Sequence, residues 1–173
     1  MKFSRFSLVL ILFLILPQIS FAQSNYVLPY PSFMPGNKFY KISLIWDEIK
    51  KYWYFGDFGQ FKYNLSQSDK HLVEARTLFD YKQYLLALSA LEKSDMYFGR
   101  VFKVLVSAKS NNKNVFEKEI LLKEASQKHF EELKKIRGNV PEVFEWRPEK
   151  ESPTILNLWE IMDDSIEIRQ KIL

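Results

Sequence analysis

The sequence contains no cysteine, which excludes disulfide bonds, thiolate nucleophiles and zinc sites with cysteine ligands. Only two of its 173 residues are histidine, too few for a histidine-rich metal centre. An excess of one charge is also lacking, because 25 basic residues stand against 21 acidic ones, a net charge of +4. Nucleic-acid-binding domains usually concentrate basic residues on one face, so the composition does not favour that class.

Catalytic motifs are missing as well. The sequence has no Gly-rich phosphate loop, no GxSxG, no HExxH and no Asp-rich calcium loop. We therefore expect a protein that is not an enzyme and that uses no cofactor and no nucleic-acid partner. A hydrolase that uses Asp95 with a neighbouring acid is the remaining enzymatic alternative.

The first 22 residues predict a signal peptide. Two basic residues precede an almost continuous apolar run over residues 6–16, and Pro17 ends that run. Eleven helical residues rise about 16 Å, roughly half of the hydrocarbon core of a bilayer. Ser20 and Ala22 supply the small residues of a cleavage site, so we expect a secreted or extracytoplasmic protein cleaved after Ala22. An uncleaved anchor is the alternative.

Proline is absent between Pro35 and Pro141, and no segment of five or more residues alternates convincingly as a strand would. We therefore predict an all-α fold, an antiparallel bundle of four helices with a fifth, amphipathic C-terminal helix. The expected organisation is a signal peptide (1–22), a proline-rich extended segment (23–36), the helical bundle (37–140), a linker (141–151) and the C-terminal helix (152–173).

The first expected helix begins at Asn37, ends before Gly56 and has an apolar stripe, which we expect to lie in the core with Trp46 at its centre. Asp57 predicts the cap of the second helix. Ser152 and the following proline predict the start of the last one. Further inward positions are Phe61, Leu65, Leu72, Ala75 and Phe79 in the second helix, Tyr84, Leu88, Leu91, Phe98, Phe102 and Leu105 in the third, Leu122, Ala125, Leu133 and Ile136 in the fourth, and Ile155, Leu158, Met162, Ile166 and Ile172 in the last.

Three stretches suggest a family. Residues 28–40 (LPYPSFMPGNKFY) combine a Leu-Pro-x-Pro start with a later Pro-x-x-x-x-Tyr-Lys pattern, residues 84–94 (YLLALSALEKS) are an alanine-containing hairpin arm, and residues 128–133 (KHFEEL) contain a Lys-His pair. Together they resemble a family of exported bacterial helical domains of unknown function, over roughly residues 26–143. The resemblance implies export and a helical fold, and no activity. One hairpin also resembles a tetratricopeptide unit, but an array needs about three copies.

Two ionisable residues occupy apolar stripes and form a candidate buried polar site. His129 lies on the stripe of the fourth helix, and Asp95 takes a stripe position in the third. A buried carboxylate must find partners or stay protonated, and a buried histidine can bind a metal or sense pH. The alternatives are a histidine that is hydrogen-bonded within the core and an aspartate that reaches solvent or pairs with a lysine.

Six aromatic residues fall within residues 52–61, at the elbow between the first two helices. Such rings can form the hot spot of a partner site. Their alternative role is to fill the elbow between the two helices. The candidate partner-binding residues are Trp53, Tyr54, Phe55 and Phe58.

The expected function is that of an exported, non-catalytic module that binds a protein or another component of the cell envelope. In that interpretation the chain meets a membrane only through an uncleaved N-terminal segment. The alternative function is a carrier of haem, lipid or metal, with its site between bundle helices.

Overall fold

The computed structural model describes residues 24–31, 33–35, 37–150 and 152–172, so the predicted signal peptide lies outside the described residues. Within them the chain forms mostly helix and one small sheet. The elements are α2 (Tyr40–Lys51), α3 (Gly56–Asp80), α4 (Tyr84–Ser110), α5 (Phe116–Asn139), β1 (Val143–Trp146), β2 (Thr154–Asn157) and α6 (Leu158–Gln170).

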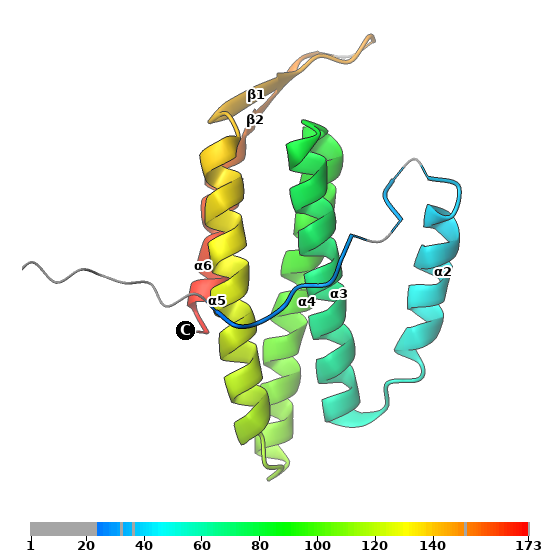
Figure 1. Cartoon of the computed structure of the whole chain (residues 1–173), viewed down its shortest axis with the longest axis vertical. Helices are drawn as coiled ribbons and strands as arrows, with labels where there is room; N and C mark the ends of the chain where they lie inside the picture. Colours follow the sequence, from blue (N-terminus) through cyan, green and yellow to red (C-terminus); the bar gives the residue numbers. More distant parts are fainter. Residues whose placement is uncertain (1–23, 32, 36, 151, 173) are drawn as a thin grey trace, which may run out of the picture.

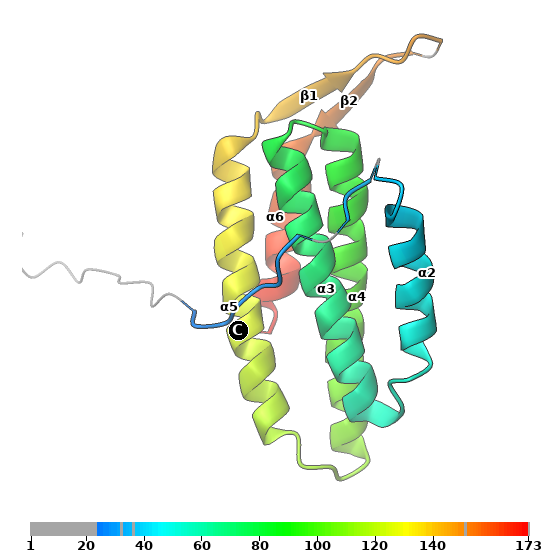
Figure 2. The same ribbon diagram turned by 45° about the vertical axis from the view of Figure 1, so that its right-hand side comes forward.

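The helices α3, α4, α5 and α6 form an antiparallel bundle, with α2 standing beside it (Figure 1). Figure 2 shows that α6 lies against α5 and spans only part of its length. The predicted helical bundle is confirmed, but its membership differs. The C-terminal helix, expected as an appendage, is the fourth bundle helix, and the helix expected first lies outside. None of the helices in the described part of the chain is long and apolar enough to cross a membrane.

The core consists of two apolar clusters at successive levels of the bundle. The first contains Leu72, Leu133 and Met162, and the second contains Leu65 and Leu122, so the bundle helices α3 and α5 contribute to both. Every inward position expected in the second and fourth helices is buried. The three- and four-residue spacing of large apolar residues therefore predicts these two helix faces correctly.

The buried face of α4 is rotated from the expected one. Leu91, Phe98 and Leu105 are buried as predicted, but Phe102 is 47% exposed. Val101 and four small residues take the remaining buried positions of α4. The small side chains allow the backbones of α3 and α4 to lie close together. The four small residues are Ala87, Ala90, Ser94 and Ala108.

A short antiparallel hairpin replaces the predicted linker and the first turn of the predicted last helix. Its register pairs Val143 with Asn157 and Trp146 with Thr154. Ser152 therefore does not cap a helix; Asn157 caps α6 by accepting a hydrogen bond from the backbone N–H of Glu160, at 3.2 Å. Each strand has only four residues, too few for alternation to be recognised in the sequence.

The turn between α2 and α3 depends on two glycines. Gly56 has a φ of 66°, in the left-handed region. A Cβ on Gly59 would lie 2.8 Å from the carbonyl carbon of Tyr54, so only glycine fits there without a shift. The helix begins at Gly56, and Asp57 is not its cap. The Asp57 carboxylate instead accepts a hydrogen bond from Lys113 at 2.8 Å.

Candidate functional site

A layer of polar side chains lies between the two apolar clusters, and we call it the polar layer. Each bundle helix contributes one serine and one ionisable residue. All of these side chains are buried except that of Asp95, which is 19% exposed. The members are Ser68 and Asp69 on α3, Ser94 and Asp95 on α4, Ser126 and His129 on α5, and Ser165 and Arg169 on α6.

The first ion pair of the layer joins Arg169 to Asp95. The guanidinium of Arg169 is fully buried and pairs with the Asp95 carboxylate, and its Nη2 donates to Ser94 Oγ at 2.9 Å. Ser165 Oγ donates to the other carboxylate oxygen at 2.6 Å. Burial lowers the pKa of Arg169, while the negative charge of Asp95 acts in the opposite direction. The pair therefore joins α4 to α6 through a guanidinium that is buried and a carboxylate that is partly exposed.

The second pair joins His129 to Asp69. His129 Nε2 lies 2.7 Å from Asp69 Oδ1, and the hydroxyl of Tyr26 donates to Asp69 Oδ2 at 2.6 Å. Burial lowers the pKa of His129, while the hydrogen bond to Asp69 opposes that shift. His129 Nδ1 has no partner among the described residues, so a proton there would be buried without an acceptor. The geometry thus favours the neutral imidazole, with Nε2 donating to Asp69.

Phe98 lies between the two pairs. Its ring centroid is 5.1 Å from that of His129 and 4.9 Å from Arg169 Cζ, close enough for a cation–π contact. The two candidate residues from the sequence, Asp95 and His129, thus belong to one layer but have different partners. Neither pairs with the other.

The partners that sequence analysis missed are Asp69, Arg169 and Tyr26. Asp69 lies on the stripe of α3, at a helical spacing from Leu65 and Leu72, so the reasoning applied to Asp95 would have found it. Arg169 likewise follows the stripe of α6. Tyr26 carries no such signal, because it lies in a segment without regular structure.

The polar layer is poorly placed to act on a substrate or to bind a metal ion. The ring of His129 is fully buried, so a substrate in solution cannot reach it. In the described residues, no group of three or more His, Asp or Glu side chains is placed to hold a metal ion. The role that this geometry supports is to fix how the four helices meet.

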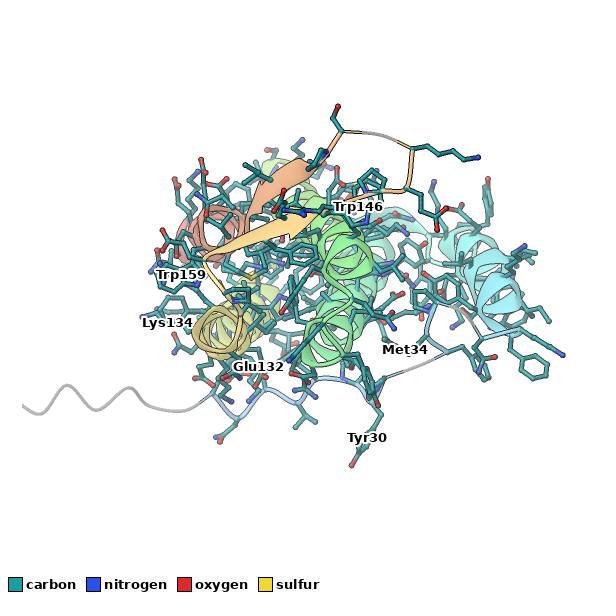
Figure 3. The ribbon with its side chains drawn as sticks, turned by 90° about the horizontal axis from the view of Figure 1, so that it is seen from above. Tyr30, Met34, Glu132, Lys134, Trp146 and Trp159 are labelled. Atoms are coloured by element: carbon teal, nitrogen blue, oxygen red, sulfur yellow. The ribbon has the colours of Figure 1, made fainter. Side chains whose placement is uncertain are left out.

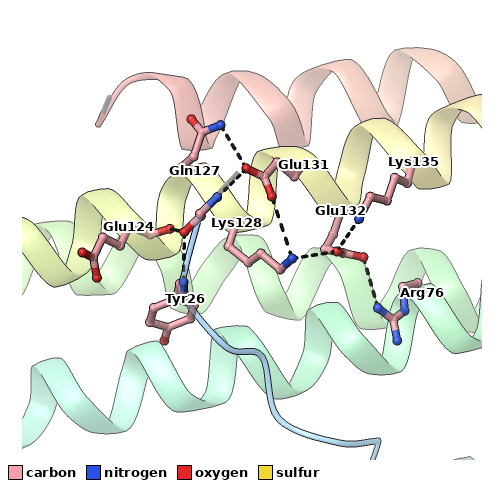
Figure 4. A network of polar contacts seen from close by, with 9 residues as sticks. Tyr26, Arg76, Glu124, Gln127, Lys128, Glu131, Glu132 and Lys135 are labelled. Carbon is pink, nitrogen blue, oxygen red and sulfur yellow. Dashed lines mark hydrogen bonds and ion pairs between the residues drawn. The ribbon is translucent and has the colours of Figure 1, made fainter. Parts of the chain in front are cut away.

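A strap of residues 24–26 crosses from α5 to α3 over one face of the bundle (Figure 4). The Ser24 amide donates to Glu131 at 3.0 Å, and its hydroxyl donates to the carbonyl oxygen of Glu124 at 2.8 Å. Tyr26 then reaches Asp69. Beside the strap, Glu132 of α5 accepts a hydrogen bond at 3.1 Å from Arg76 of α3. The strap and this bond hold α3 and α5 together.

A cleft of about 720 Å³ opens between α3 and α5. Tyr26 and Asp69 line it, so it reaches one edge of the polar layer. Its other lining residues are Phe58, Gly59, Phe61, Lys62, Leu65 and Ser66 from α3 and Lys118 and Leu121 from α5.

The helix α2 turns its apolar stripe to solvent. Four side chains of the helix and one flanking side chain at each end, between 41% and 62% exposed, make up what we call the α2 surface: Phe39, Ile42, Ile45, Trp46, Ile49 and Trp53. Seen from above, α2 lies at the edge of the molecule away from α5 and α6 (Figure 3). The prediction that this stripe and Trp46 belong to the core is wrong, and α2 has no buried residue.

Polar contacts hold α2 against α3 and explain its orientation. Lys70 pairs with Asp47, and Tyr63 Oη donates to the carbonyl oxygen of Asp47 at 3.1 Å. Tyr40 hydrogen-bonds to Glu74, and burial together with this carboxylate raises the pKa of Tyr40. The polar side of α2 is therefore its inner side.

The candidate partner-binding rings of the elbow are mostly exposed rather than buried between helices. Trp53 belongs to the α2 surface, Phe55 is 82% exposed, and Phe58 is exposed beside the cleft. Tyr54 differs, because it is half-buried and its ring lies 5.8 Å from that of Tyr63.

Comparison of the chain with protein-family models, with curated proteins and with solved structures finds no match. Two features could bind something outside the molecule, the α2 surface and the cleft, whereas the polar layer faces inward.

Stability is expected to fall as the pH drops below about 6.5, the ordinary pKa of histidine. The folded state holds His129 below its ordinary pKa, so the unfolded chain binds a proton first and acid favours unfolding. This stabilisation is present above about pH 6.5 and is lost toward the folded pKa, by at most about 1.4 kcal/mol per pH unit. Glu74 and Glu132 have lowered pKa values, so the stability that their ionised carboxylates contribute to the folded state is lost at more acidic pH.

Urea unfolding at several pH values measures this slope. The variant His129→Gln should be less stable than the wild type but should lose the part of the slope that begins just below about pH 6.5. An identical slope in both proteins would assign the pH dependence to other groups.

Proposed function

We propose that this protein is a non-catalytic module of the cell envelope that binds an anionic membrane surface through the α2 surface. The observation that carries the proposal is the orientation of α2, whose polar side contacts α3 while its apolar stripe faces solvent. A helix of a soluble domain normally does the reverse. Exposed apolar surface of this extent is typical of a binding site.

The charges of α2 support an anionic partner. Lys38, Lys41 and Lys51 are exposed and have no carboxylate partner among the described residues. Of the two acids on the helix, Asp47 is already neutralised by Lys70, which leaves Glu48. An amphipathic helix with lysines beside an aromatic and aliphatic face is typical of segments that lie in the membrane interface.

The composition of the α2 surface favours a membrane over a protein partner. Phe39, Trp46 and Trp53 recur along the stripe, and aromatic rings, tryptophan above all, favour the level of the lipid headgroups. A second copy of the chain would bring the unpaired lysines of both copies together, which disfavours a dimer through this surface. This proposal extends the expectation from the sequence, in which only the N-terminal segment could meet a membrane.

Vesicle binding tests the proposal. The protein would be recovered after export by a bacterial host, and its mass would show whether cleavage follows Ala22. We expect the cleaved form to bind vesicles that contain phosphatidylglycerol, with a blue shift of tryptophan fluorescence, and to bind pure phosphatidylcholine vesicles at least about tenfold more weakly.

Matched variants identify the surface that binds. Ile45→Glu should weaken vesicle binding at least about tenfold without lowering the thermal midpoint, because Ile45 is exposed. Val106→Glu is the control, since Val106 is a similarly exposed apolar residue on α4. Equal binding by Ile45→Glu and the wild type would overturn the proposal. A wild-type dimer that Ile45→Glu converts to a monomer, with no vesicle binding, would assign the surface to a second copy instead.

A further inference from the structure

The cleft between α3 and α5 has apolar walls. Phe61 and Leu65 line the α3 side and are buried, and Leu121 lines the α5 side and is half-buried. The ring of Phe58 is exposed at the margin. The volume of about 720 Å³ lies within the range of about 300–1,000 Å³ that small-molecule sites occupy. These walls suit a hydrocarbon chain.

Two lysines face this cleft from opposite walls, Lys62 from α3 and Lys118 from α5. Neither has an ion-pair partner within the described residues. Lys113 nearby differs, because it pairs with Asp57 at 2.8 Å. Two uncompensated ammonium groups above an apolar cleft attract an anionic headgroup.

Tyr26 of the strap lines the cleft beside Asp69, at the end next to the polar layer. Asp69, the acid among the lining residues, already accepts hydrogen bonds from Tyr26 and His129 through its two oxygens. It follows Lys62 by seven residues, about 10 Å along the helix. A headgroup held by the lysines therefore lies well away from this carboxylate.

We infer that the cleft binds a single-chain amphipathic anion of the fatty-acid type. The carboxylate lies between Lys62 and Lys118, and the hydrocarbon chain contacts Phe61, Leu65 and Leu121. This site is separate from the α2 surface, and it does not depend on membrane binding.

Calorimetric titration of the exported, cleaved protein with decanoate tests this inference. We expect one decanoate per chain with a Kd below about 100 μM. The uncharged 1-decanol should bind at least about tenfold more weakly, because it lacks the charge that the lysines attract. No heat of binding with decanoate up to about 1 mM would overturn the inference.

Variants locate the bound decanoate. The double variant Lys62→Gln/Lys118→Gln should bind at least about tenfold more weakly, whereas Lys123→Gln, an exposed lysine of α5 outside the cleft, should not differ from the wild type. Ser66→Trp should abolish binding, because Ser66 is exposed in the lining and an indole there fills the cleft.

Each contrary result has a defined meaning. Unchanged affinity in Ser66→Trp, or in the double lysine variant, would overturn the assignment of the cleft. Ile45→Glu should keep full decanoate affinity, and loss of binding in that variant would place decanoate on the α2 surface instead. The vesicle experiment and this one can therefore fail independently.

Discussion

Replacing Arg169 by methionine is expected to lower the free energy of unfolding by about 3–5 kcal/mol, the usual effect of removing one partner of a buried ion pair. The Arg169 side chain is fully buried, and its loss leaves the Asp95 carboxylate without its cation. Ser94 also loses the hydrogen bond that Arg169 Nη2 donates. Urea unfolding measures the change, which a domain of ordinary stability can tolerate while remaining folded.

A double variant separates the ion pair from side-chain packing. Adding Asp95→Leu to Arg169→Met removes the uncompensated charge, so the double variant should be more stable than Arg169→Met alone by roughly 2–3 kcal/mol. If the two substitutions instead destabilise additively, the pair contributes through packing alone and the electrostatic explanation is wrong.

The second large effect is expected at Phe98, where substitution by alanine should lower the free energy of unfolding by about 3–5 kcal/mol. Its ring is fully buried and contacts both the His129 ring and the Arg169 guanidinium. Alanine therefore leaves a cavity beside both pairs of the polar layer. Thermal or urea unfolding gives the size of the loss.

Phe102 is the matched control, one turn further along the same helix. Its ring is half exposed, so Phe102→Ala should lower the free energy of unfolding by less than about 1 kcal/mol. The sequence pattern alone treats the two phenylalanines as equivalent inward residues. Equal losses at both positions would mean that α4 is rotated toward the register that the sequence suggested.

Spacing of apolar residues predicts those parts of the fold in which large side chains meet other large side chains. It identifies the inward faces of α3 and α5, because Leu65, Leu72 and Leu133 face the core at helical intervals. It misplaces part of the α4 face, since alanine and serine contribute little to a hydrophobic pattern although they set the close contact with α3. The pattern therefore predicts that large residues beside that contact, such as Phe102, are buried, whereas the Phe102 side chain is exposed.

The orientation of α2 could not be predicted in the same way. A stripe such as that around Trp46 shows that one side of a helix is apolar, but not whether the protein itself covers that side. The contacts that decide it, Lys70 with Asp47 and Tyr40 with Glu74, join residues far apart in the sequence. The members of the polar layer could be suspected from their stripe positions, but their pairing depends on which helices become neighbours.

The place of α6 in the chain has a consequence for the order of events during synthesis. Arg169 follows its partner Asp95 by 74 residues, so the helices made first emerge with that carboxylate unmatched and their leucines uncovered. Long-range closure of this kind delays folding until the distant segment has been made. A nascent chain that stops short of residues 158–170 lacks Leu158, Met162 and Ile166 from the core and has no cation for Asp95. The last segment of the chain to be made is thus the one that supplies the buried arginine and completes the core.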